Sequence, residues 1–335
     1  MKKLALLMAL FATAGFIGCS SSSDGGPSYT GSTAKAVVDE GNGLDFAEAT
    51  TYALKMLFDE EGLPLLPINE SPSRIAAAGS TQQSYEGDCG GTLDYSYTED
   101  YDPDTGSLFE QTIVVADSYC SEVDYPTTDG NILSGKAVST YDRVVPAAPR
   151  SAELVIVGTT QEQTYSFTNW SIITPASISE SSEDETMVFN GTQSRSNIAP
   201  DTFDSYMVNI FIKYIEGEAA PLVAKFDLTG TFYYSSGLHS AEGEIYFDDQ
   251  GYLTLSTHED YKVNYVPPSY DPLFSSGGVT LEGDNGSKLR MDFISYPFYG
   301  YDLSLWDQTI GETGDWGPDT YFDLDWEVIQ LPVKM

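Results

Sequence analysis

The stretch that decides the fold class is GEIYFDDQGYLTLST, residues 243–257. Four of its apolar residues fall on one face of a β-hairpin if the loop consists of residues 249–251: Ile245, Phe247, Leu253 and Leu255. A two-residue loop would place Ile245 opposite Thr254 and scatter this set, because a slip of one residue turns every side chain to the other face. A three-residue loop with glycine in the left-handed conformation is a common hairpin connection. We therefore predict an antiparallel hairpin here.

The same rule applies at a second loop, residues 284–286, which read Asp-Asn-Gly. It produces two apolar and two polar cross-strand pairs: Val279–Met291, Leu281–Leu289, Thr280–Arg290 and Glu282–Lys288. The apolar pairs share the core face, and the polar pairs share the face in water. Two hairpins that follow one template indicate an antiparallel β architecture.

A third hairpin is centred on residues 103–106. Folding the chain there brings Cys89 opposite Cys120 and Tyr95 opposite Val114. Cross-strand neighbours lie about 4.5–5.5 Å apart, within the span of a disulfide. A redox-active pair would need closer spacing and basic surroundings. We predict a structural disulfide between Cys89 and Cys120.

Further strands are predicted, and the short segments with Gly, Asp, Asn and Pro between them indicate that neighbouring strands are antiparallel. They are residues 134–143, 153–159, 164–173, 185–193, 205–215, 223–234, 303–306 and 321–329. A loose apolar–polar–Gly signature recurs at 133–135, 189–191 and 228–230 and is consistent with equivalent strand bends. The predicted fold is all-β, a large antiparallel meander that is either barrel-like or a two-sheet sandwich.

One short N-terminal amphipathic helix is predicted at residues 45–58, with Gly62 as its stop signal. Its apolar residues recur at helical spacing: Phe46, Ala49, Ala53, Leu54, Leu57 and Phe58. Packing on the sheet explains this stripe better than binding a partner helix. The predicted organisation is a leader at 1–18, a lipidated cysteine and flexible tether at 19–38, the helix and a connector at 39–90, and an antiparallel β domain at 91–335.

The leader combines Lys2 and Lys3 with the apolar run 4–17, the layout of a secretory signal peptide. Residues 16–19, Phe-Ile-Gly-Cys, resemble the lipobox of bacterial lipoproteins, with phenylalanine where leucine is commonest. The resemblance implies cleavage before Cys19, lipid on that cysteine, and a place in the cell envelope. Ser20 rather than aspartate follows, which by analogy with the family favours the outer membrane, facing either the periplasm or the outside. The body resembles uncharacterised β-rich envelope lipoproteins of no specific family.

The chain is strongly acidic, with 51 Asp and Glu residues against 15 Lys and Arg. Removing a leader that holds Lys2 and Lys3 would leave 13 basic residues and a net charge near −38. Such a field repels nucleic acid, which we exclude as a partner, and it attracts cations. The expected partners are the membrane, through the N-terminal lipid, and an unknown envelope protein or a small apolar ligand.

The cofactor prediction is none, with calcium as the alternative. Asp100, Asp102 and Asp104 alternate ahead of Gly106 like the start of an EF-hand loop, but the glycine comes one position late and Gln111 replaces the last ligand. A second group consists of Asp319, Asp323 and Asp325, which share a face if they lie on a strand. An ordinary hairpin loop explains the first group, and a charged sheet edge explains the second.

An aromatic group near the C-terminus is the candidate ligand platform: Tyr296, Phe298, Tyr299, Tyr301 and Trp306. Aromatic rings of this kind stack on sugars, although core packing is the more common role. The 243–257 register places His258 opposite Glu242 and His239 near Tyr261, on the polar face. The histidine spacing matches neither a zinc site nor a catalytic triad.

These observations predict a lipid-anchored, acidic, non-enzymatic envelope protein that acts as a binding or interaction module. One alternative is a carrier of lipid or another apolar ligand in a β-barrel cavity. A second is a carbohydrate-binding or carbohydrate-active protein that uses paired carboxylates.

Overall fold

The computed structural model describes residues 29–58, 79–102, 104, 106–121, 130–144, 160–177, 183–199, 203–217, 221–248, 250–265, 272–294, 300–307, 315–316 and 320–323. As predicted, the protein is mainly antiparallel β-sheet with one helix. The chain divides into two compact units, which we describe separately. Unit 1 contains residues 29–62 and 222–335, and unit 2 contains residues 63–221. The predicted strand 153–159 lies outside the described residues.

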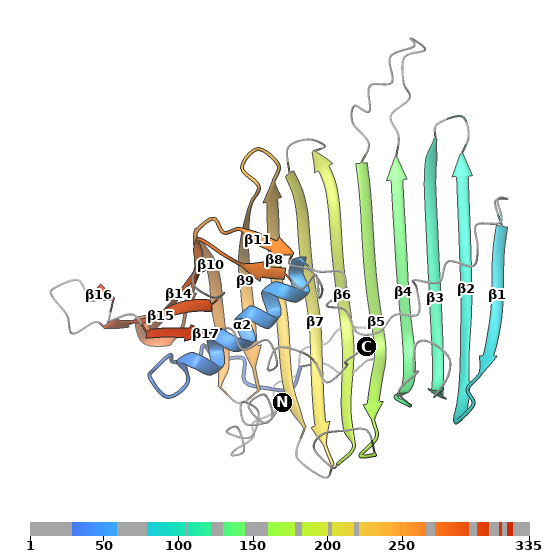
Figure 1. Ribbon diagram of the computed structural model, residues 1–335, viewed down its shortest axis with the longest axis horizontal. Helices are drawn as coiled ribbons and strands as arrows, with labels where there is room; N and C mark the ends of the chain where they lie inside the picture. The colour runs from blue at the N-terminus through green and yellow to red at the C-terminus, as the bar shows by residue number, and fades with distance from the viewer. Residues whose placement is uncertain are drawn as a thin grey trace. The chain divides into compact units, whose positions relative to one another are not determined.

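Seven strands form the sheet of unit 2, each antiparallel to the next in chain order (Figure 1). They are β1 Gly79–Glu86, β2 Gly90–Asp102, β3 Ser107–Cys120, β4 Ile132–Val144, β5 Thr160–Thr174, β6 Glu185–Ala199 and β7 Phe203–Glu216. Six of them run for 13 to 15 residues. A usual strand has about 5–6 residues. Each face of this sheet therefore carries several rows of side chains.

The two faces of the unit 2 sheet differ in character. One row crosses β2 to β7 with buried apolar side chains: Tyr95, Val114, Ala137, Phe167 and Ile210, with Gly191 between the last two. The neighbouring row on the opposite face is mostly polar: Ser96, Ile113, Val138, Ser166, Thr192 and Asn209. This alternation is the usual pattern of an antiparallel sheet with one buried face.

A line of β-bulges crosses the unit 2 sheet. The extra residues lie near Ser118 on β3 and Asn169 on β5, and both of these residues have positive φ, 53° and 50°. The strands on either side place Gly91, Gly135 and Gly191 next to them. A Cβ atom at Gly135 would lie 2.1 Å from the carbonyl oxygen of Asn169, so no larger residue fits. We call these five residues the bulge line.

The bulge line resets which side chains are buried. Phe167 and Trp170 are both buried although they are three residues apart, and so are Ala116 and Tyr119. The extra residue on each bulged strand makes this possible, because it restores the apolar side chains to the core face. Two copies of the apolar–polar–Gly signature, 133–135 and 189–191, fall on this line. The third copy, 228–230, lies on β8 in unit 1, where Gly230 packs against the helix.

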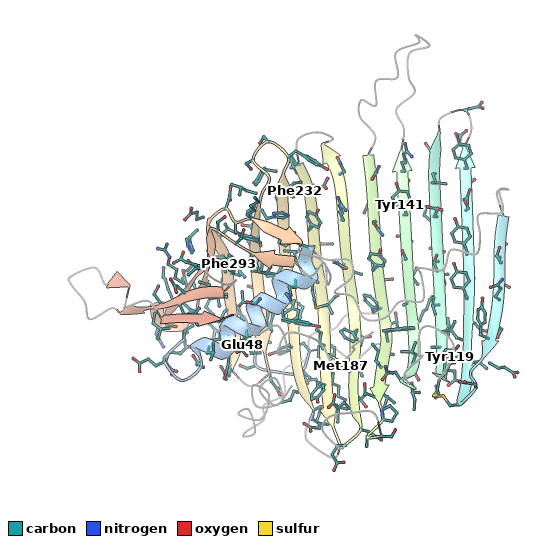
Figure 2. The ribbon with its side chains drawn as sticks, in the orientation of Figure 1. Glu48, Tyr119, Tyr141, Met187, Phe232 and Phe293 are labelled. Atoms are coloured by element: carbon teal, nitrogen blue, oxygen red, sulfur yellow. A yellow bond between two sulfur atoms is a disulfide. The ribbon has the colours of Figure 1, made fainter. Side chains whose placement is uncertain are left out.

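The predicted disulfide joins Cys89 to Cys120, with the two Cα atoms 5.3 Å apart (Figure 2). The predicted pairing of Tyr95 with Val114 is confirmed. Cys120 pairs with Gly90 rather than Cys89, because the bulge near Ser118 adds one residue to β3. The disulfide therefore ties the start of β2 to the end of β3.

The main sheet of unit 1 follows the order β8, β9, β10, β13, β14, β15, with β16 and β17 both paired to β15. Their bounds are β8 Leu222–Tyr233, β9 Leu238–Phe247, β10 Gly251–Glu259, β13 Gly278–Glu282, β14 Lys288–Ile294, β15 Gly300–Asp307, β16 Asp315–Trp316 and β17 Thr320–Asp323. A separate pair consists of β11 Val263–Tyr265 and β12 Pro272–Phe274. A 3₁₀ turn, η1 Asp284–Gly286, connects β13 to β14.

The second predicted hairpin is confirmed in all four of its pairs. In the first, the predicted faces are correct but the pairs are shifted by two residues, with Ile245 opposite Leu253 and Phe247 opposite Gly251. Gly251 lies in the strand, with φ 99°, and not in the loop. It is needed there because the N-terminal segment runs alongside, and a Cβ atom would lie 2.1 Å from the carbonyl oxygen of Ala34.

The helix, α2 Gly43–Phe58, packs on β8, β9 and β15 and lies across the sheet in Figure 1. The predicted stripe is buried except for Ala49, which is partly exposed. The ring centroids of Phe46 and Phe247 are 4.5 Å apart. Gly230 allows the close approach, because a Cβ atom there would lie 2.7 Å from Phe58. Among the described helices, none has the length and apolar character to span a bilayer.

Part of the predicted tether is ordered in unit 1. The Tyr252 N–H donates to the carbonyl of Ala34, and the Ala36 N–H donates to the carbonyl of Tyr252. Ala36 and Val38 are buried. Residues 34–38 therefore belong to the packed body.

Neither unit forms a barrel. Among the described strands of unit 2, β1 and β7 do not pair with each other, and in unit 1 the same holds for β8 and β15. The meander prediction is thus correct, whereas its barrel-like form is wrong. The described strands of each unit therefore enclose no interior.

The bulge line makes a testable prediction at Gly135. We expect Gly135→Ala to destabilise unit 2 by well over 1 kcal/mol, because the substitution adds backbone strain and a steric clash. Gly90→Ala is the control, since Gly90 also has positive φ but no atom lies within 4 Å of its added Cβ. Urea unfolding should show a larger loss for Gly135→Ala, and equal losses would contradict the role of close packing at this position.

Candidate functional site

The first predicted aspartate group lies at the β2–β3 hairpin. Asp100, Asp102 and Asp104 are all exposed. The Asp104 N–H donates to Asp102 Oδ1 over 2.9 Å, a contact that closes the turn. In the described ranges, no group of three or more His, Cys, Asp or Glu side chains is arranged to hold a metal. Calcium binding at this hairpin stays a prediction.

The other predicted groups lie largely outside the described residues, as does Cys19. This applies to Asp319, Asp325, Tyr296, Phe298 and Tyr299. For the remaining three residues the structure gives the backbone pairing: Asp323 opposite Gly300, Tyr301 opposite Phe293 and Phe322, and Trp306 opposite Trp316. The aromatic platform is therefore an untested prediction.

The structure corrects the prediction for His258. Ser256, not His258, pairs with Glu242, because the hairpin register is shifted by two residues. The His258 ring instead reaches over β13 and joins a polar network. Gly278 makes room for it, since a Cβ atom there would lie 2.9 Å from the ring carbon Cε1.

The His258 network contains Thr280, Arg290 and Asp292 as well as the histidine. His258 Nδ1 lies 3.0 Å from Thr280 Oγ1, and His258 Nε2 lies 2.9 Å from Asp292 Oδ1. Arg290 donates to both carboxylate oxygens of Asp292, over 2.7 and 3.0 Å. The sequence indicated only that Thr280 faces Arg290. The signal that sequence reasoning missed was Gly278: its lack of a side chain leaves room for the His258 ring over β13.

The order hydroxyl, imidazole, carboxylate is that of a nucleophile activated by a general base. Acyl transfer also requires donors placed where an oxyanion develops, and a strained or shaped turn that presents the nucleophile. Thr280 lies instead in the middle of a regular strand, and Arg290 already engages the carboxylate. We interpret the His258 network as cross-strand pairing on the polar face of unit 1.

The structure also corrects the prediction for His239. Its predicted neighbour, Tyr261, is confirmed by backbone hydrogen bonds in both directions, of 2.7 and 2.9 Å. However, His239 is buried rather than on the polar face, with 7% exposure. Its ring lies 4.9 Å from Phe58 and 4.7 Å from Phe232, which is labelled in Figure 2.

Burial has an electrostatic consequence for His239. It lowers the pKa of the imidazole to about 4, because the charged form loses its hydration among aromatic rings. The Nδ1 atom of His239 and the hydroxyl of Tyr261 are both buried without a described partner. At neutral pH, His239 is an uncharged part of the core that joins α2 to the sheet.

A depression of about 400 Å³ lies over β1, β2 and β3 of unit 2. Two cross-strand rows on one face line it: Gln82, Ser96 and Ile113 in one row, and Ser84, Asp94 and Val115 in the other. Gln83 and Tyr95 complete the lining, and Tyr95 is buried on the opposite face. Val115 is 42% exposed, so apolar surface on β3 is open to a ligand. We call this site the edge depression.

The edge depression lies beside the end of the sheet. Residues 80–86 of β1 are all exposed, and within the described chain β1 pairs only with β2 (Figure 1). The sequence did not predict this strand, because residues 79–86 lie in the stretch expected to be a connector. The depression and the outer edge of β1, which has no second partner among the described strands, together form the candidate binding site.

The buried histidine predicts a loss of stability in mild acid. The pKa of His239 is lowered on folding, so the unfolded chain binds the proton more readily as the pH falls from about 6.5 to 4. Because unfolding is coupled to this proton binding, the free energy of unfolding falls by about 2 kcal/mol between pH 7 and pH 5. We expect His239→Phe to reduce the pH dependence of urea unfolding by that amount. Phe46→Leu is the control, because the Phe46 ring packs on Phe247: it should destabilise unit 1 at both pH values and leave the slope unchanged.

No protein-family model matches this chain, and comparisons with curated proteins and with solved structures found no match.

Proposed function

We propose that this protein is a lipid-anchored, acidic envelope protein that acts as a non-enzymatic binding module through the edge depression. The single observation that carries the proposal is the 400 Å³ depression, with polar sides and exposed Val115, beside the open edge of β1. Sites of this size accept side chains or small ligands, and the adjoining edge offers backbone hydrogen bonds.

The anchor part of the proposal rests on the lipobox-like residues 16–19. Lipid attached at Cys19 would hold the body at a membrane, since several acyl chains together give stable attachment. The Ser/Gly-rich sequence 20–32 is predicted to act as a tether that gives the body reach. Both β-sheet units would then face the aqueous side of the membrane.

The geometry favours a binding module over the two alternatives. A carrier would shelter an apolar ligand in a closed barrel, and neither described sheet closes. A carbohydrate site on the C-terminal aromatic residues has no described geometry behind it. The edge depression is instead open to solvent, with Val115 exposed, and we expect it to accept a segment of another protein.

The anchor makes a direct prediction. We expect Cys19→Ser to move the protein from the membrane fraction to the soluble fraction of cells, because the lipidated sulfur is lost. Fractionation with detection of the protein checks this result. Ser22→Ala is the matched control and should stay with the membranes. Retention of the Cys19→Ser protein would contradict the anchor.

The binding region is tested by photocrosslinking from defined positions in the membrane-anchored protein. A crosslinker at Gln82, on the edge depression, should give an adduct that maps to one segment of one envelope protein. The control position is Thr168, which is exposed on the same face of the sheet. Equal yields at both positions would rule out the edge depression as the binding region, and a lipid adduct at Gln82 would favour the carrier.

A further inference from the structure

We infer that the outer edge of β1, which pairs with no second strand in the described chain, binds an extended, cationic peptide segment as an additional β-strand, with its alternate side chains over the edge depression. This inference rests on the proposed function and specifies its partner. Three features of unit 2 support it: the geometry of β1, the alternation of its side chains and the charge of the three strands at this end.

The geometry of β1 suits strand addition. Its eight residues pair with β2 in an unbroken register, from Gly79 opposite Glu99 to Glu86 opposite Thr92. An edge strand turns alternate N–H and C=O groups outward, where another strand can bind them. Proteins usually protect such edges with lysine, proline, a bulge or a very short strand. β1 has none of these features along its described length.

The side-chain alternation supplies a subsite. Every second residue of an added strand would lie on the face that carries Gln82 and Ser84, beside the edge depression. A side chain there must cross two strand spacings, about 10 Å, to reach the row on β2. Lysine and arginine have this reach when the opposing Asp94 side chain extends toward them. Their aliphatic stems would lie over Gln82 and Ser84 on β1 while the charge stays at the carboxylate, as long basic side chains commonly do.

The charge of this region selects the partner. Residues 79–121 contain nine Asp and Glu residues and no Lys, Arg or His. Five of these carboxylates lie on the face of the edge depression or at its strand ends: Glu86, Asp94, Asp100, Asp102 and Asp117. Cationic segments are therefore attracted to this end of the sheet. A second copy of the chain would bring the same carboxylates together and is repelled.

The test uses the full-length protein and a ten-residue probe peptide that alternates lysine with valine. We expect fluorescence anisotropy to show binding that weakens as salt is raised. A second peptide has the same sequence with an N-methyl group on every amide, which keeps the charge but removes the hydrogen-bond donors of both strand edges. Its affinity should be at least tenfold lower. Equal affinity of the two peptides would overturn strand addition.

Protein variants localise the site. Ser84→Lys places a like charge beside the edge depression and should weaken binding of the lysine–valine peptide at least tenfold. Thr168→Lys makes the same charge change on the same face at β5 and should alter the affinity less than twofold. Equal losses in both variants would show that the peptide responds only to net charge, and would overturn the site.

The partner's chemistry is tested by exchange of charge. A glutamate–valine peptide should not bind, and comparable binding of this peptide would overturn the cationic preference. A concentration-dependent dimer that Ser84→Lys abolishes would assign the edge to a second copy instead.

If crosslinking at Gln82 succeeds while the lysine–valine peptide fails to bind, this inference fails and the proposed function stands. If crosslinking is equal at Gln82 and Thr168, the proposed function itself fails.

Discussion

The backbone ladder between consecutive strands is the constraint on which the rest of unit 2 depends. Each strand from β1 to β7 is held by the next strand in the chain, and the register of one pair fixes the faces of all the others. The row from Tyr95 to Ile210 is buried because every cross-strand pair along it joins residues that point to the same face of the sheet. An error of one residue in any pair would turn a whole strand over.

The bulge line shows how this constraint is kept over long strands. Bulges increase the local twist and shift the phase of a strand by one residue. Ser118 and Asn169 hold the extra residues, and the glycines beside them let the neighbouring backbone approach. Gly135 also lets the Trp170 backbone come close, since a Cβ atom there would lie 2.8 Å from Trp170 Cα. Polar and glycine residues in the middle of these strands are thus structural, and they need no ligand to explain them.

The sequence predicted the parts of the fold that depend on local pattern. The hairpin at 284–286 and the pairing of Tyr95 with Val114 followed from alternation and turn chemistry, and the helix followed from its apolar spacing. The 243–257 register was shifted because Gly251 accommodates residues 34–36, a contact between segments more than 200 residues apart that alternation cannot indicate. β1 was missed for a different reason: with both faces exposed, Ser, Thr and Gln leave no apolar pattern. The candidate site lies there, at the position where sequence patterns carry least information.

The chain-order pairing of β1 to β7 has a consequence for how this unit acquires its structure. Contacts between neighbours in sequence close short loops, so the entropy lost at each step is small, and folding rates rise as contact order falls. Each new strand can pair with the strand that precedes it in the chain, once that strand is in place. The Cys89–Cys120 bond would then lock the second hairpin of the series, β2 with β3, while later strands are still adding on the β7 side.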